Sequence, residues 1–281
     1  MRFAKLHGTG NDFIVIDARE QERDWAKLAV AICERHTGAG ADGILLVKAP
    51  SAAKAALRMV LYHADGSEAE MSGNGMRCFV KYAVDRGLAR LEEGVVAVDT
   101  LAGVLTVAVT LSGSRVESAR VAMGKPRFAP QEIPVAIEAE PPIQDYPLTL
   151  DGRTIPVTCV SMGNPHAVHF IDSAVDEYPL HELGPRVEHH PLFPRRVNFG
   201  VARVLGRDRM DVRVWERGAG ETLACGTGVS AAVVAARLKK LVDERVTVSQ
   251  PGGSLLVEWD GAGEVYLTGP AVEVYEGEWP E

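Results

Sequence analysis

Two residues that could carry proton-transfer chemistry stand in equivalent contexts. Cys225 is followed by Gly226-Thr227-Gly228, and Ser72 is followed by Gly73-Asn74-Gly75. Each Gly-rich segment opens a helical pattern, and the start of a helix offers unpaired N–H groups and partial positive charge that favour a bound carboxylate or phosphate. The same dipole is expected to lower the pKa of the Cys225 thiol, which makes it a candidate base or nucleophile. Such a pair could exchange protons with opposite faces of one carbon and so invert a stereocentre.

Taken alone, each Gly-rich segment could equally be a tight turn, but the two belong to an internal repeat. The matching blocks are 10–13 with 163–166, 68–75 with 221–228, and 96–107 with 246–257. The first two pairs are offset by 153 residues and the third by 150. Three blocks in the same order predict two homologous halves, each carrying one helix-end anion site.

The elements that would position these sites are mostly strands. Runs rich in β-branched residues predict strands at Phe13–Asp17, Ile44–Val47, Leu57–Tyr62, Val95–Thr100, Leu105–Leu111, Val157–Ser161, Ala167–Ile171, Val201–Leu205, Asp211–Trp215, Arg245–Ser249 and Leu255–Trp259. Helical patterns cover Arg23–His36, Asn74–Arg86, Pro179–His190 and Gly226–Leu241. The simplest arrangement is an α+β fold in which a curved sheet surrounds a central helix, made twice.

Two further patterns concern the helix after Cys225 and the middle of the chain. Residues Val229–Leu238 are apolar nearly all round, so their helix is expected to be wrapped by other structure. Residues Ala129–Tyr146 hold four prolines and are expected to form a connecting loop near the boundary between the halves.

Composition excludes several classes of protein. The 281 residues include 30 basic and 38 acidic side chains, and a net charge of −8 without a basic tract argues against nucleic-acid binding. No stretch approaches the roughly 18 apolar residues of a membrane span, and the N-terminus lacks the core of a signal peptide. We therefore expect no membrane association and a cytoplasmic protein.

The four cysteines show no metal-ligand spacing, so neither a structural zinc site nor paired disulfides are expected. Cys33, Cys78 and Cys159 are expected to be buried core residues. Nothing in the sequence requires a metal.

The chain resembles the diaminopimelate epimerase family over essentially its whole length. The matching segments are KLHGTGNDFIVID (5–17), ADGSEAEMSGNGMRC (64–78), SMGNPHAV (161–168), RVNFG (196–200), WERGAGETLACGTG (215–228), PGGSLLVEW (251–259) and YLTGPA (266–271).

The resemblance implies an isomerase of lysine and cell-wall synthesis that interconverts LL- and meso-diaminopimelate without pyridoxal phosphate or any other cofactor. It implies two pseudo-symmetric domains, 1–118 with 264–281 and 119–263, each a β-barrel-like sheet around a helix. The active site would lie in the cleft between them, and the protein would be a homodimer.

The resemblance also assigns roles to single residues. Cys225 aligns with one cysteine of the catalytic pair, and Ser72 stands at the position of the other. Substrate-binding roles fall on Asn11, Asn164, Asn198, Glu216 and Arg217, and the reacting carboxylate is assigned to Gly73, Asn74, Gly226 and Thr227. His166 matches a supporting histidine near the catalytic pair.

Two positions depart from the family pattern. His63 stands where the family has a substrate-binding asparagine, which affects the far end of the substrate. Ser72 replaces a cysteine, and a hydroxyl is a far weaker acid and a poorer base than a thiol. Cys78 lies six residues on, about 9 Å along a helix, so it cannot stand in for position 72.

Ser72 leaves several interpretations open. It could be an engineered substitution that traps substrate, or a natural variant that relays a proton through water. The chain could also be a racemase or isomerase of another amino acid with the same fold. A carboxylate-binding protein with impaired or no catalysis would show the same helix-end sites.

Overall fold

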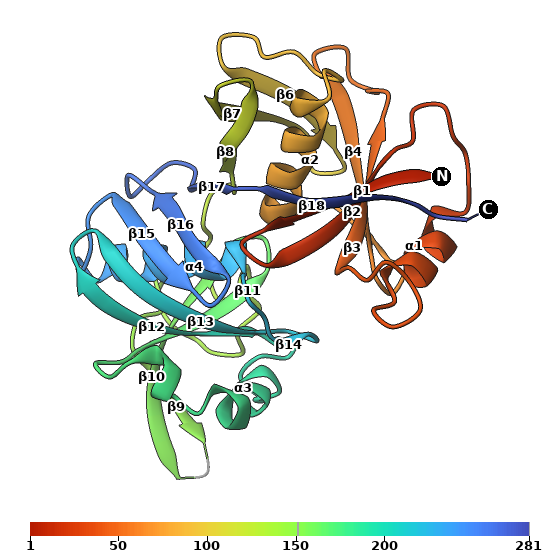
Figure 1. The fold of residues 1–281 in the computed structure, drawn as a ribbon. Helices are drawn as coiled ribbons and strands as arrows, with labels where there is room; N and C mark the ends of the chain where they lie inside the picture. The colour runs from red at the N-terminus through yellow and green to blue at the C-terminus, as the bar shows by residue number, and fades with distance from the viewer. Residues whose placement is uncertain (151, 281) are drawn as a thin grey trace. The chain divides into compact units, whose positions relative to one another are not determined.

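The computed structural model describes residues 1–150 and 152–280, and the chain forms two compact units. Unit 1 consists of Met1–Ala122 and Thr268–Glu281, and unit 2 of Met123–Leu267. Strands dominate both units, and four α-helices lie among them in the described residues (Figure 1). The fold is therefore mixed α+β, as expected. None of the described helices is long and apolar enough to cross a membrane.

Unit 1 is built on one run of paired strands, in the order β18-β1-β2-β3-β4-β6-β7-β8. The pairs β2–β3 and β4–β6 are parallel, and the others are antiparallel. The strands are β1 (Arg2–Gly8), β2 (Asn11–Asp17), β3 (Gly43–Lys48), β4 (Leu57–His63), β5 (Glu68–Ala69), β6 (Val95–Thr100), β7 (Gly103–Ser112), β8 (Arg115–Ala122) and β18 (Val272–Glu278).

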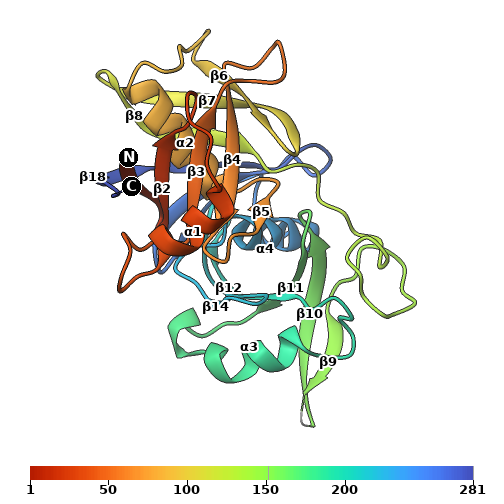
Figure 2. The same cartoon turned by 90° about the vertical axis from the view of Figure 1, so that its right-hand side faces the viewer.

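Helices α1 (Trp25–Cys33) and α2 (Gly73–Asp85) cover opposite faces of β2 and β3 (Figure 2). Ile14 and Ile16 belong to the apolar cluster beneath α1. Leu45, which points to the other face of β3, lies 3.3 Å from the place of a Cβ at Gly75 in α2. Because both faces are covered, β2 and β3 are continuous apolar runs rather than alternating ones.

Unit 2 repeats this strand pattern. Its strands are β9 (Tyr146–Leu150), β10 (Arg153–Ser161), β11 (Pro165–Phe170), β12 (Asn198–Gly206), β13 (Arg209–Glu216), β14 (Gly220–Glu221), β15 (Arg245–Gln250) and β16 (Gly253–Glu258). The pairs β11–β12 and β13–β15 are parallel, as β2–β3 and β4–β6 are in unit 1. The repeat seen in the sequence is thus present in the strand pairing. Strand β17 (Tyr266–Pro270) lies where the chain returns from unit 2 to unit 1.

The helices of unit 2 are α3 (Leu180–Glu188), α4 (Gly226–Leu238) and the short 3-10 helix η1 (Val175–Glu177). Every α4 residue from Val229 to Ala236 is buried, so the prediction that this helix is wrapped is confirmed. All four predicted helices are present, and three end two or three residues before their predicted limits. In α4 the chain leaves the helix near Lys240, whose φ of 59° is left-handed.

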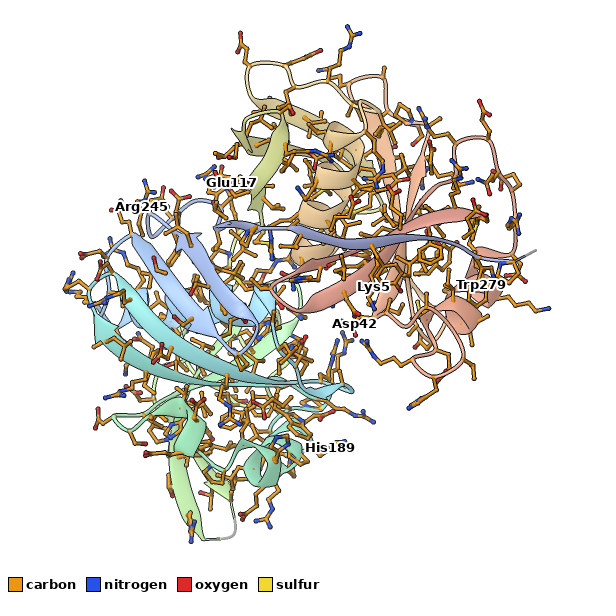
Figure 3. All side chains as sticks on the ribbon, in the orientation of Figure 1. Lys5, Asp42, Glu117, His189, Arg245 and Trp279 are labelled. Atoms are coloured by element: carbon orange, nitrogen blue, oxygen red, sulfur yellow. The ribbon has the colours of Figure 1, made fainter. Side chains whose placement is uncertain are left out.

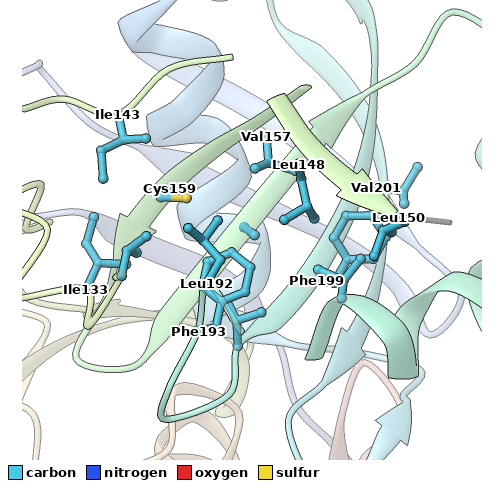
Figure 4. Packing of buried hydrophobic residues seen from close by; sticks show 14 of the residues in the cluster. Ile133, Ile143, Leu148, Leu150, Val157, Cys159, Leu192, Phe193, Phe199 and Val201 are labelled. Atoms are coloured by element: carbon cyan, nitrogen blue, oxygen red, sulfur yellow. The ribbon is translucent and has the colours of Figure 1, made fainter. Parts of the chain in front are cut away.

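The proline-rich stretch 129–145 has no helix or strand, as predicted, but it contributes to the core. Ile133 and Ile143 are almost fully buried in a cluster that also contains Leu148, Cys159 and Phe199 (Figure 4). The segment therefore packs into the core of unit 2, to which it belongs, and β9 begins directly after it.

Candidate active site

Ser72 is the N-cap of α2. Its backbone is extended, with φ −140° and ψ 125°, and its Oγ accepts a hydrogen bond of 3.0 Å from the Gly75 N–H. Serine is among the best residues for this role, because its oxygen satisfies a donor that has no partner within the helix. The hydroxyl proton is still free to be donated elsewhere.

Asn11 links the start of α2 to the turn between β1 and β2. Its Oδ1 accepts from Asn74 Nδ2 at 3.1 Å, and its own Nδ2 donates to Asp42 Oδ2 at 2.6 Å. Asp42 is in turn bonded by Arg35 at 2.7 Å. The orientation of the Asn11 carboxamide is therefore set from both sides.

Behind Asn11 lies a charged network that includes Lys5 and Asp42, both labelled in Figure 3. Asp12 pairs with Lys5 and Arg35, each at 2.9 Å. Burial raises the pKa of Asp12, but hydrogen bonds from Arg35 and Lys5 outweigh this and hold the pKa below its usual value. The Asp12 carboxylate therefore stays ionised at neutral pH.

Cys225 is the N-cap of α4, but its side chain makes no capping hydrogen bond. Its backbone N–H donates instead to Gln250 Oε1 at 3.0 Å, and its Sγ lies 3.6 Å from Thr227 Oγ1. Gly228 is required beside it, since a Cβ there would lie 3.2 Å from the sulfur and 2.8 Å from Val214. The thiol is thus held tightly among packed neighbours.

The prediction that the helix dipole lowers the pKa of the Cys225 thiol is wrong. Burial raises the pKa of the thiol well above its usual value, and the negative charge of Glu216 raises it further. Interactions of the sulfur with the Thr227 hydroxyl and with the nearby Gly228 N–H act in the lowering direction but are outweighed. A helix dipole is a partial charge, whereas a neighbouring carboxylate carries a full one and burial removes the water that would solvate a thiolate.

Asn164 occupies in unit 2 the place that Asn11 has in unit 1. Its Nδ2 donates to Thr227 Oγ1 at 3.2 Å, and the sequence separation of 63 equals that between Asn11 and Asn74. Its Oδ1 lies 2.9 Å from His166 Nε2. Since an amide oxygen only accepts, this nitrogen of His166 carries the proton.

His166 is 1% exposed on β11. Burial, with a contribution from the charge of Arg217, lowers its pKa to about 3. The imidazole is therefore neutral near pH 7, where it orients Asn164 and is a weak base.

Asn198 joins two other predicted site segments. Its Nδ2 donates to the Pro165 carbonyl at 2.8 Å, and its Oδ1 accepts from the Arg217 N–H at 2.9 Å. Asn198 is 3% exposed. Through these two hydrogen bonds its carboxamide links β11, β12 and the turn after Glu216. Its predicted contact with substrate stays a prediction.

The structure therefore gathers the predicted residues into two groups. In unit 1, Ser72, Gly73, Asn74 and Asn11 meet at the start of α2, while His63 is exposed at the end of β4. In unit 2, the group at the start of α4 comprises Cys225, Gly226, Thr227, Asn164, His166, Asn198, Glu216 and Arg217.

The other three cysteines are buried, as expected. Burial raises the pKa of Cys33, Cys78 and Cys159 to about 12 in each case. Among the residues that the structure describes, no group of three or more His, Cys, Asp or Glu side chains could hold a metal ion.

Sequence reasoning missed three residues that orient the site. Gln250 binds the Cys225 N–H, Thr222 Oγ1 donates to Glu216, and Glu188 accepts from the Gly218 N–H at 2.9 Å. The Nε2 of Gln250 is buried without a hydrogen-bond partner in the described part of the chain. Gln250 and Thr222 had a signal, since Gln250 adjoins the PGGSLLVEW segment and Thr222 lies within WERGAGETLACGTG; Glu188 lies in no matched segment or repeat block.

Comparison with known proteins identifies the kind of chain that carries these groups. The family model for diaminopimelate epimerase matches residues 3–129 and 158–274. A diaminopimelate epimerase of Moorella thermoacetica is 48% identical, with 100% of this chain and 99% of the relative covered. One of Acetivibrio thermocellus is 45% identical, with 99% and 98% covered.

Solved structures of lower identity share the fold. A phenazine biosynthesis protein of the PhzF family from Bacillus anthracis has a TM-score of 0.72 at 17% identity, covering 100% of this chain and 99% of its own. A probable proline racemase from Agrobacterium radiobacter has a TM-score of 0.71 at 15% identity, covering 99% and 92%. At these identities the likeness concerns the fold alone.

Replacing Glu216 with glutamine is expected to lower the pKa of the Cys225 thiol, because one of the two causes that raise it is removed while burial is kept. The ultraviolet absorbance of the thiolate, followed against pH, measures this. Cys225→Ala, made alone and with Glu216→Gln, subtracts the signal of the other cysteines. Identical titrations with and without Glu216 would contradict the electrostatic account.

The free energy of unfolding is expected to fall as the pH drops from about 7 to about 5. An unfolded histidine takes up a proton near pH 6.5, whereas His166 in the folded state does so only near pH 3. The unfolded state thus binds more protons in this window, so stability is complete above it and is lost toward acid.

Urea unfolding across this pH range tests the assignment to His166. His166→Gln should show a shallower dependence on pH than the wild type. His63→Gln, at an exposed side chain at the end of β4, is the control and should leave the slope unchanged. Equal slopes in the wild type and His166→Gln would refute the assignment of this pH dependence to His166.

Proposed function

The chain belongs to the diaminopimelate epimerase family, and from this we propose that it interconverts LL- and meso-diaminopimelate by removing and returning the proton at one α-carbon. The observation that supports this most directly is the equivalence of Ser72 and Cys225. Each is the N-cap of a helix whose first residues bond an asparagine of the repeat. Cys225 would act on one face of that carbon, and Ser72 on the other.

The two helix starts supply the electrostatic part of the mechanism. When an α-proton leaves, negative charge builds up on the adjoining carboxylate. Backbone N–H groups of Gly73, Asn74, Gly226 and Thr227 would face that charge, and fixed donors stabilise it without reorganising. Proton removal in this scheme uses only the chain's own residues.

Glu216 would control the Cys225 base. Without substrate, burial and the Glu216 carboxylate together keep the thiol protonated. The ammonium group of a bound amino acid, placed beside Glu216, would offset that charge and lower the pKa of the thiol. The backbone N–H of Arg217 donates to Asn198 Oδ1 at 2.9 Å. The guanidinium of Arg217 suits a carboxylate of the same ligand.

Ser72 would act on the other face as a proton donor. Its oxygen is engaged by the Gly75 N–H, and its hydroxyl proton remains available for donation to the carbanion or to a relaying water. A hydroxyl is a poor base at neutral pH, so proton removal on this side should be slower than on the Cys225 side.

We also propose that the two units are the domains of this enzyme, each with its sheet closed around its central helix. Contacts of α2 with β1, β2, β3, β4, β8 and β18 support this, as do contacts of α4 with β10, β11, β12, β13 and β16. The bounds expected from the sequence, 1–118 with 264–281 and 119–263, lie a few residues from those of the compact units.

A homodimer is the assembly that we propose. On β18, Val272 and Val274 are 46% and 54% exposed, and Tyr275 is 41% exposed. A second copy of the chain would cover this apolar row. Sedimentation velocity should give twice the mass of the chain, whereas a monomer at all accessible concentrations would exclude the dimer.

Hydrogen exchange at the α-carbon in D₂O tests the reaction with each isomer separately. The wild type should exchange and invert both LL- and meso-diaminopimelate, one more slowly than the other. Exchange from only one isomer would indicate an impaired pair. Inversion of a different amino acid, with none of diaminopimelate, would refute the substrate.

Ser72→Cys is expected to raise the slower exchange rate by about 10²-fold or more, because a thiol is a far better base. It should also lower the free energy of unfolding by about 1 kcal/mol, since the cap for Gly75 is lost. Ser72→Ala is the control, with the same loss of stability and no gain in rate. If Ser72→Cys is no faster than the wild type, position 72 is not catalytic.

A further inference from the structure

Arg77 is a cation enclosed near the start of α2. Its side chain is 0% exposed. The guanidinium donates through Nη1 to Asn74 Oδ1 at 2.9 Å, through Nε to the Pro270 carbonyl at 3.1 Å, and through Nη2 to Thr9 Oγ1 at 3.3 Å. All three acceptors are neutral.

Arg77 has no counter-ion among the residues that the structure describes. Within residues 1–150 and 152–280, no carboxylate lies within 4.0 Å of its guanidinium. Burial lowers its pKa to about 10, so the group remains charged near pH 7. An unpaired buried charge is costly to a fold, and such groups normally have an ionic partner. Lys5, in the same unit, has one in Asp12.

Unit 2 has no cation at the corresponding place. The residue 153 positions on is Ser230, which is also 0% exposed and donates to the Gly226 carbonyl at 2.8 Å. The buried charge is therefore a property of only one half of the repeat. It belongs to the half in which serine replaces the thiol, and so to the half with the weaker acid–base group.

Arg77 also sets the geometry of the helix start. Because it holds Asn74 Oδ1, the Nδ2 of Asn74 is turned to Asn11. Gly8 makes room for the guanidinium, since a Cβ there would lie 2.8 Å from Nη2. The β1–β2 turn, Asn74 and Arg77 are thus joined in one hydrogen-bonded network.

We propose that Arg77 is a positioning residue whose charge is compensated by the carboxylate of an α-amino acid ligand held at the start of α2. The inference rests on the proposed function and extends it to a residue that need not touch the substrate. The positive charge adds to that of the helix dipole, and its effect grows as the carboxylate takes up charge from the departing proton. The charge of the ligand's carboxylate offsets a charge that the described residues leave uncompensated.

Arg77→Gln and Arg77→Lys separate charge from geometry. For Arg77→Gln, KM for diaminopimelate should rise about 10- to 100-fold, because a full charge close to the ligand is lost at a partly screened site. Arg77→Lys keeps the charge but not the fork of donors, and it should recover most of that loss. Arg115→Gln, at a 67% exposed cation near Asp85 in the same unit, should leave KM unchanged.

The unfolding free energies of the variants give the second readout. A merely structural role would impair Arg77→Lys and Arg77→Gln alike, with activity following stability. If Arg77→Gln had the wild-type KM, or if Arg77→Lys were as impaired as Arg77→Gln, the inference would be overturned while the proposed function would stand. A wild type that exchanges neither isomer would overturn the proposed function and, with it, the inference.

Discussion

The starts of helices α2 and α4 lie among packed residues, and this enclosure constrains the structure around them. The first N–H groups of a helix have no partners within it, and when the helix start is enclosed they must find them in side chains, water or a ligand. At α2 the oxygen of Ser72 supplies one. At α4 the sulfur of Cys225 supplies none, and Gln250 takes the N–H of the cap residue instead. The repeated asparagines then tie each helix start to its own strand turn.

The electrostatics of both halves follow from that enclosure. In unit 1 the buried charge of Arg77 stands without a counter-ion in the described residues, and in unit 2 burial and Glu216 keep Cys225 protonated. In the reaction that we propose, the carboxylate of the amino acid would offset the charge of Arg77, and its ammonium group would offset that of Glu216.

Much of the fold was predictable because its signals are local or repeated. The four helices and eleven of the strands follow from hydrophobic patterning, and the repeat predicted the matching strand pairings of the two units. Seven of the described strands were not predicted, namely β1, β5, β8, β9, β14, β17 and β18. In β18 the outer residues Val272 and Val274 are apolar, so the alternation of buried and exposed residues does not show in the sequence, and its partner β1 lies at the other end of the chain.

The sequence by itself determined the repeat, the pair of helix starts, the family and the presence of serine at position 72. All of these depend on residue identity and spacing. The protonation of Cys225, the low pKa of His166 and the lack of a counter-ion for Arg77 within residues 1–150 and 152–280 arise only once the chain is folded. Each depends on burial and on which charges come close in space. Glu216 is only nine residues from Cys225, but it acts on the thiol because β13, β14 and the start of α4 fold it back.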